Sequence, residues 1–388
     1  MQKSGCPQVE GARQAASTSA FFDTLGFNVA VSELENKRAD GLTPLAHLQA
    51  LGVKHLRGNA SVPLGLSGAL ATTLLNAGMR YTFALSLKTD LDAFLPMTLG
   101  VTEAVQVASP ANDWIGPYSV TELPAAAERW RAQLNALDSA KRPALIGPII
   151  FQTMDAMDLG SVGPWIDFGG FRYTIGLVAP SRSFGGDWEQ MALSVSGGKP
   201  LVASKASYAT SRPGLPEPQL SEDLQAKYVV RLFLEGFNHA VIRTHYDKLY
   251  DDDCSESGCT SGLIRVDGTS KPSYLAWAAL VKALGAPSQP PTPRALPLTI
   301  EAPTNVHSLL LSNSEGAFFL LLWLEVNGKP GEDQQAPAVV QVGVPLASAQ
   351  MLDLRQPGQA PSDLGKMGRF SLAVSDAPML ITLTPACF

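Results

Sequence analysis

The sequence has no long hydrophobic run and no cluster of basic residues. Its longest apolar run, 317–324, has the length of a β-strand, whereas a membrane-crossing helix needs about 20 apolar residues, so we expect no transmembrane segment. Acidic residues outnumber basic ones, 35 to 29, giving a net charge of −6. Nucleic-acid binding depends on clustered Lys and Arg, so the charge pattern argues against such a partner.

Motifs for nucleotide, serine-hydrolase or zinc chemistry are also missing. No GxGxxG or P-loop string follows a candidate strand, and neither GxSxG nor HExxH nor CxxC occurs. We therefore expect no cofactor and no metal ion. The acidic loop 251–256 lacks the ligand spacing of an EF-hand, which favours a solvated loop over a calcium site.

Cysteine is scarce, with four residues. Cys254 and Cys259 lie in one polar loop, while Cys6 and Cys387 lie near opposite ends of the sequence. An even number outside apolar strands predicts disulfides, 254 with 259 and 6 with 387, and an oxidising compartment; four free thiols is the alternative. The polar first 20 residues hold no signal core, so we expect either a cytoplasmic protein or a mature secreted or periplasmic one, and the cysteines favour export.

An alternation of short β-branched runs with helix-period stretches fills residues 25–286. It predicts a (β/α)8 TIM barrel, and a doubly wound open sheet is the competing architecture. The predicted helices include 64–77, 122–137 with a capping box from Ser119 to Glu122, 187–195, 222–237 and 272–284. The predicted strands are 27–31, 55–59, 80–86, 103–108, 144–150, 171–178, 200–207 and 240–245.

The composition changes after the barrel. A proline-rich linker, 287–297, precedes apolar runs separated by turn residues over 298–388, a pattern that predicts an antiparallel β-sandwich. The arm 1–24 is expected to pack on this sandwich before the chain enters the barrel.

Functional side chains of a TIM barrel follow the carboxyl ends of its strands. Arg57 stands there on the second strand, and Asp113 follows the fourth. Asp247 follows the eighth. Other polar or aromatic candidates for ligand binding at this mouth are Asn112, Trp114, Arg172, Tyr173, Lys205, Tyr208, Tyr246 and His245. His245 and the aromatic residues also suit simple packing. Lys205 suits either a ligand-binding cation or a salt bridge with Asp247 or Asp113.

Several segments resemble the glycoside hydrolases of clan A, whose barrels carry one catalytic glutamate after strand four and another on strand seven. They are LGVKHLRGN, EAVQVASPAND (103–113), KPLVASKASYATS (199–211) and, most specifically, 226–284. The resemblance implies a carbohydrate-active barrel, often with an appended sandwich. Arg57 matches a rim arginine of that clan. Arg172 and Asp247 stand where the clan often has histidine and tyrosine.

Both glutamates are replaced in this alignment. Ser109 and Pro110 stand at the Asn-Glu pair that carries the acid/base, and Lys205 stands at the nucleophile. Retaining hydrolysis needs two carboxyl groups about 5–5.5 Å apart, and an ammonium opposes the positive charge of the transition state. The sequence therefore predicts an inactive glycosidase-like protein that binds carbohydrate or a protein partner. The alternatives are an active hydrolase using Asp113 and Asp247, and an interaction protein whose mouth is filled by its own side chains.

Overall fold

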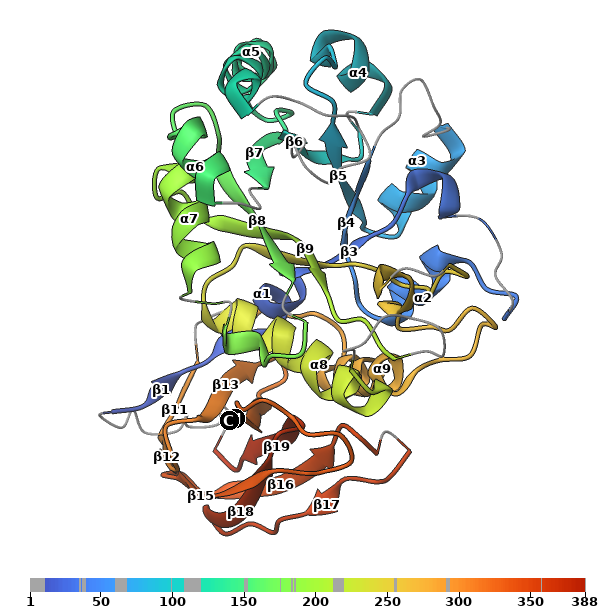
Figure 1. The fold of residues 1–388 in the computed structure, drawn as a ribbon. Coiled ribbons are helices and arrows are strands. Elements are labelled where there is room, and N and C mark those ends of the chain that lie inside the picture. The colour runs from blue at the N-terminus through green and yellow to red at the C-terminus, as the bar shows by residue number, and fades with distance from the viewer. Residues whose placement is uncertain are drawn as a thin grey trace.

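A computed structural model gives the fold (Figure 1). It describes residues 11–34, 36, 40–59, 68–98, 100–107, 120–149, 153–174, 176–182, 184, 186–211, 220–254, 257–290, 294–356 and 358–387.

Eight parallel strands close into a barrel, which confirms the predicted TIM barrel and excludes the open sheet. Each strand lies beside the next one along the chain, and the last pairs with the first. The predicted strands are found with small shifts at their ends. The barrel strands are β3 (Leu25–Asn28), β4 (His55–Asn59), β5 (Arg80–Leu85), β6 (Thr102–Val107), β7 (Ala144–Ile149), β8 (Phe168–Thr174), β9 (Leu201–Ser207) and β10 (Arg243–Tyr246).

Helices cover the outside of the barrel (Figure 1). A short helix, α1 (Thr18–Phe22), precedes β3, and its Phe21 and Phe22 enter the barrel core. The barrel helices are α2 (Pro44–Ala50), α3 (Gly68–Asn76), α4 (Leu91–Thr98), α5 (Leu123–Asn135), α6 (Thr153–Leu159), α7 (Asp187–Ser196), α8 (Glu222–Asn238) and α9 (Pro272–Leu284). Single 3-10 turns are η1 (Val31–Glu33), η2 (Val120–Glu122), η3 (Pro180–Arg182) and η4 (Ser257–Thr260).

Helix α5 follows Glu122, which is its N-cap and makes no side-chain capping bond. The predicted capping box stays a prediction, because Ser119 lies outside the described residues. Pro124 stands in the first turn, where a missing N–H costs no hydrogen bond. By contrast, the side chain of Ser221 accepts a bond from the Leu224 amide and caps α8.

Two sheets form the predicted sandwich, and all their strand pairs are antiparallel except that of β2 with β13. One contains β12 (Leu298–Glu301), β15 (Gln335–Val342) and β18 (Arg369–Ser375). The other contains, in order, β17 (Ser362–Asp363), β16 (Leu346–Asp353), β19 (Met379–Pro385), β14 (Phe318–Leu324), β13 (Val306–Ser312) and β2 (Ala16–Ser17). A separate ribbon pairs β1 (Arg13–Gln14) with β11 (Ala295–Leu296). The N-terminal segment thus pairs at two places with strands of the C-terminal third.

The apolar run of β14 is buried on both faces. Phe318, Leu320 and Leu322 join the core between the two sheets, whereas Leu321 and Trp323 join the core shared with the barrel. Alternate side chains of a strand point to opposite faces, and here both faces pack against apolar cores. The strand can therefore be apolar at every position. The sandwich is therefore packed on the barrel through the sheet that contains β14.

Helix α8 lies between the barrel and the sandwich (Figure 1). Its Lys227 and Arg231, one turn apart, have fully buried side chains that bind sandwich residues. Lys227 Nζ lies 2.9 Å from Asp333 Oδ1, and Arg231 Nε lies 2.7 Å from Glu325 Oε2. These ion pairs join the sandwich to one helix of the barrel.

One of the predicted disulfides, Cys254–Cys259, is present, with Cα atoms 5.8 Å apart. Cys387 is also disulfide-bonded, while Cys6, its predicted partner, lies outside the described residues. Among the helices in the described ranges, none is long and apolar enough to cross a membrane.

Candidate functional site at the carboxyl end of the barrel

A network of buried polar side chains crosses the barrel interior towards the carboxyl ends of the strands. Arg57 Nε on β4 donates to Gln106 Oε1 on β6 at 2.6 Å, and Gln106 Nε2 donates to Ser204 Oγ on β9 at 2.8 Å. Asn28 Nδ2 on β3 donates to the Ser204 carbonyl at 3.0 Å. Each of these bonds joins two strands that are not neighbours in the sheet, so the groups can meet only inside the barrel. The network fixes the floor of the mouth.

Lys205 and Asp247 form an ion pair above this floor. Lys205 Nζ on β9 lies 2.9 Å from Asp247 Oδ2, just after β10. The two side chains remain 30% and 24% exposed, so solvent reaches the pair. The salt bridge that the sequence suggested for Lys205 thus forms, with Asp247 as its partner.

Two further cations lie near this pair. Arg172 on β8 is in register with Lys205, and its residue is partly buried. Lys248 follows Asp247 and forms an ion pair with Asp252. Burial lowers the pKa of Lys248, and the nearby charge of Lys205 lowers it further, while Asp247 acts in the opposite direction. The ammonium groups of Lys205 and Lys248 therefore both lie near Asp247.

A buried lysine holds the loops beside the mouth. Lys271 Nζ, at the start of α9, donates to Asp251 Oδ1 at 2.9 Å, to Thr210 Oγ1 at 3.0 Å and to the Thr260 carbonyl at 2.9 Å. Burial lowers the pKa of Lys271 and raises the pKa of Asp251. Asp251 is therefore not part of a freely solvated acidic loop. It connects the loop after β10 to the loop after β9.

A second polar network lies at the amino ends of the strands. His55 Nδ1 on β4 lies 2.7 Å from Glu103 Oε2 on β6, and His55 Nε2 lies 3.1 Å from Asp23 Oδ1. Arg243 Nη2 on β10 lies 3.3 Å from the same Glu103 oxygen. Burial lowers the pKa of His55, but hydrogen bonds to Asp23 and Glu103 outweigh it and raise the pKa overall. Charged groups thus occupy the end of the barrel opposite the mouth.

Three predicted mouth residues are buried instead. Tyr208 is 1% exposed, and Tyr246 and His245 are 0% exposed. The Tyr208 ring lies tilted against Tyr228 of α8, with ring centroids 5.1 Å apart, and the Tyr246 hydroxyl donates to the Ser261 carbonyl at 2.9 Å. These side chains therefore have the packing role that the sequence also allowed: Tyr208 packs against α8, Tyr246 bonds to a loop, and His245 faces the closed interior.

Other predicted residues cannot be placed. Pro110, Asn112, Asp113 and Trp114 lie outside the described residues, as does the side chain of Tyr173. Sequence reasoning missed Asn28, Gln106 and Ser204. A signal was present for Gln106, a polar residue within the otherwise apolar run Ala104–Val107 of a barrel strand.

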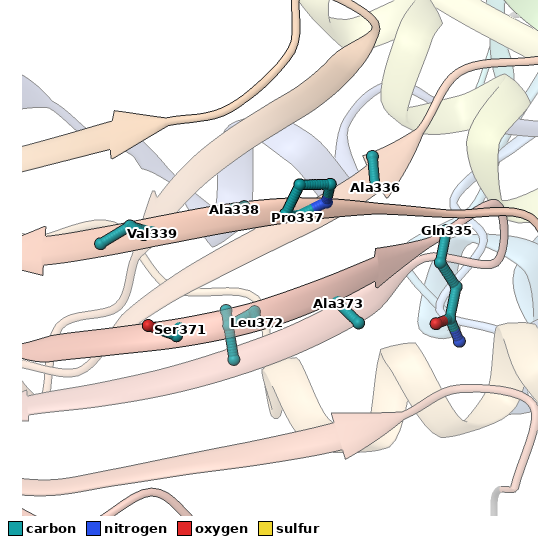
Figure 2. Close-up of a pocket in the computed structure, with 8 residues that line it drawn as sticks. All are labelled: Gln335, Ala336, Pro337, Ala338, Val339, Ser371, Leu372 and Ala373. Atoms are coloured by element: carbon teal, nitrogen blue, oxygen red, sulfur yellow. The ribbon is translucent and has the colours of Figure 1, made fainter.

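The described residues can bind polar or anionic groups at the mouth, through Lys205, Arg172 and Lys248. Within the described ranges, no cluster of three metal-ligating side chains occurs. An open depression of about 580 Å³ lies elsewhere, over β15 and β18 of the sandwich (Figure 2). Small and aliphatic side chains line it and no titratable group does, so the barrel mouth is the candidate site.

No protein-family model matches the chain, and no curated protein matches its sequence. Solved structures match its fold. A family 39 glycoside hydrolase from Bacteroides cellulosilyticus WH2 aligns with a TM-score of 0.63 and 11% identity, over 96% of this chain and 83% of that one.

Two further solved structures align with lower TM-scores. A family 17 β-1,3-glucanosyltransferase from Rhizomucor miehei aligns at 12% identity over 65% of this chain and 96% of that one, with a TM-score of 0.48. A calcium-binding mutant of β-glucuronidase 2 from Bacteroides uniformis aligns at 11% identity over 92% and 43%, with a TM-score of 0.49. At these identities the likeness shows the fold, a barrel with an appended sandwich like that of the family 39 enzyme.

Proposed function

We propose that this protein is a glycoside-hydrolase-like barrel that binds a carbohydrate at the carboxyl ends of its strands and does not hydrolyse it. The observation that carries the proposal is the ion pair of Lys205 with Asp247. Lys205 stands where the clan A resemblance expects the nucleophilic glutamate. Its ammonium cannot attack the anomeric carbon as a carboxylate does, and it opposes the positive charge that develops there.

Asp247 is a poor substitute for the missing carboxylate. One of its oxygens is bound by Lys205 at 2.9 Å. A nucleophile needs a free oxygen facing the sugar, and a general acid needs a second carboxyl group opposite it. The group that contacts Asp247 is instead the ammonium of Lys205.

Partial exposure of the ion pair supports binding rather than a closed mouth. Lys205 and Asp247 retain 30% and 24% of their side-chain exposure, whereas a mouth filled by its own side chains would exclude solvent from them. Lys205 and Arg172 can donate to sugar hydroxyls, and the buried Arg57 network keeps the floor beneath them rigid.

The proposal also includes export. The Cys254–Cys259 disulfide supports an oxidising compartment, since disulfides rarely persist in the cytosol. Secretion is tested by locating the natural protein in culture supernatant, periplasm and cytosol.

The function is tested by pairing a binding assay with a hydrolysis assay. Calorimetric titration with neutral and acidic oligosaccharides is expected to find a saturable ligand, whose affinity falls about tenfold or more in Lys205→Met and Arg172→Met, the loss expected for one charge-assisted hydrogen bond. Lys282→Met, an exposed lysine of α9, is the matched control and should bind normally.

Hydrolysis of 4-nitrophenyl glycosides and of the bound oligosaccharide should stay at the level of the buffer blank. Cleavage that disappears in Asp247→Asn or Asp113→Asn would instead establish an active hydrolase. Failure to bind any sugar in the panel would contradict the proposal and favour an interaction protein.

A further inference from the structure

His55 lies between two carboxylates at the amino ends of the barrel strands. Its Nδ1 lies 2.7 Å from Glu103 Oε2 on β6, and its Nε2 lies 3.1 Å from Asp23 Oδ1 at the end of α1. A neutral imidazole has only one N–H, and an ionised carboxylate can only accept a hydrogen bond. Both bonds therefore form only while the ring is an imidazolium.

The two carboxylates are held to the protein unequally. The side chain of Glu103 is 10% exposed, and Arg243 Nη2 and Thr82 Oγ1 also bind it. The side chain of Asp23 is 67% exposed, so water can replace His55 as its partner. A ring that loses one proton is therefore expected to keep the N–H on Nδ1, for Glu103, and to turn the lone pair of Nε2 towards Asp23.

The charges around the ring favour the ionised arrangement. Burial opposes the charge of His55, as does Arg243, but the hydrogen bonds to the two carboxylates outweigh both and raise the pKa of His55. The hydrogen bond from this ring lowers the pKa of Asp23, and the charges of Arg243 and Lys54 lower it further. Asp23 is therefore a carboxylate throughout the pH range in which the ring titrates.

His245 on β10 is a second imidazole close enough to sense the charge of His55. Burial, followed by the charges of Arg57 and Arg243, holds the pKa of His245 well below its usual range, so this ring is neutral. His55 is therefore the one of these two imidazoles that carries a proton in the folded protein.

We propose that His55 is a pH-sensitive latch that holds the end of α1 to the barrel as an imidazolium and releases Asp23 when it loses a proton. Phe21 and Phe22 of α1 remain in the barrel core, so release loosens the turn that leads into β3 without opening the barrel. Because folding raises the pKa of His55, the latch contributes fully below the ordinary histidine pKa, about 6.5, and its contribution is lost as the pH rises through the raised value. The latch lies at the opposite end of the barrel from the proposed carbohydrate site and does not depend on it.

An NMR titration of the His55 ring nitrogens is the first test. Both nitrogens should be protonated below a midpoint that lies above about 6.5, and the neutral ring above this midpoint should carry its proton on Nδ1. Asp23→Asn removes one carboxylate and should lower the midpoint. A midpoint at or below about 6.5 in the wild type, or a neutral ring protonated on Nε2, would overturn the proposal.

Hydrogen exchange tests the release of the turn. The amides of Asp23 and Thr24 donate to the carbonyls of Ser19 and Phe21, respectively. After correction for the intrinsic exchange rate, their protection should fall by about two- to fivefold as the pH rises through the His55 midpoint, the change expected when a partly exposed ion pair is lost. Amides of the sandwich strand β19 should not follow this transition. An equal fall in β19 would mean a general loss of stability and would contradict a local latch.

Asp23→Asn is the matched variant for this experiment. An asparagine can form a hydrogen bond with either form of the ring, so the pH-dependent fall in protection should disappear. Asp158→Asn, at an exposed carboxylate of α6, is the control and should keep the fall. A fall that persists in Asp23→Asn, or its absence in the wild type, would show that His55 does not control the turn.

Discussion

Arg231 of α8 and Glu325 of the sandwich form a fully desolvated ion pair. Arg231 Nε lies 2.7 Å from Glu325 Oε2, and the side chains are 0% and 2% exposed. Further bonds satisfy both groups: Arg231 Nη2 donates to the Val326 carbonyl at 2.9 Å, and Glu325 Oε1 accepts from the Ser181 amide at 2.8 Å. Both side chains therefore keep these hydrogen bonds only while the barrel and the sandwich stay packed together.

We expect Arg231→Leu to lower the free energy of unfolding by about 3–5 kcal/mol, because it leaves the carboxylate of Glu325 buried without its cation. Urea denaturation measures the loss. The double variant with Glu325→Leu should recover much of it, since no lone buried charge remains. Arg142→Leu, at an exposed arginine bonded to Asn135, is the control and should change stability by less than about 0.5 kcal/mol. A similar loss in the single and double variants would contradict this account.

The pair of Glu235 and His307 predicts a pH dependence of stability. Glu235 Oε1 lies 2.6 Å from His307 Nδ1, and this hydrogen bond outweighs burial and raises the pKa of His307. The folded state then binds the proton more tightly than the unfolded state. The stabilisation is complete below the ordinary histidine pKa, about 6.5, and is lost as pH rises through the raised value.

The measurement is the difference in unfolding free energy between wild type and His307→Gln across pH 5–9, as an experimental range spanning that transition. The advantage of the wild type should shrink as pH rises. An NMR titration of His307 gives its pKa directly, and a value at or below 6.5 would rule out the mechanism.

Gly26 and His245 should be energetically coupled. Gly26→Ala places a methyl group against the His245 ring, so we expect a loss of about 1–3 kcal/mol from overpacking. In a double-mutant cycle with His245→Ala the methyl group has room, and the combined loss should be smaller than the sum of the single losses. Gly68→Ala, at a glycine with no atom near the added methyl, is the control. Additive losses would show that the ring does not lie against Gly26.

Lys271 should be essential to the loops beside the mouth. Lys271→Met removes three donors and leaves Asp251 without its cation, so we expect a loss of about 3–5 kcal/mol. Hydrogen exchange should also increase in the loops around residues 210 and 260. Lys282→Met, on the exposed side of the same helix, should change neither quantity. A loss below about 1 kcal/mol would mean that other contacts hold these loops.

The architecture was predictable because short apolar runs alternate with helix-period stretches over residues 25–286. The limits of β4 are those that its sequence predicts, while β8 begins three residues earlier than expected, because Phe168-Gly-Gly has little strand character of its own and pairs through its neighbours. Gly170 is required there: an added Cβ would lie 2.6 Å from the side chain of Gln106.

The candidate site was predictable only in part. Local sequence placed Lys205 and Asp247 at strand ends, and they form the expected pair. It could not distinguish ligand binding from packing for Tyr208 and His245, because the direction of a side chain near a strand end depends on register shifts such as the one between Thr244 and Tyr246. The charges of α8 at Lys227, Arg231 and Glu235, four residues apart in an apolar helix, were a readable signal of a polar interface.

The pairing of β2 with β13 has a consequence for how the polypeptide is made. Ala16 lies beside Leu311, so this segment is synthesised almost 300 residues before the strand that it pairs with. Domains generally fold as they emerge, so the barrel strands can assemble while this segment has no partner. The edge of the six-stranded sheet is then covered only after the barrel between the two segments has been made.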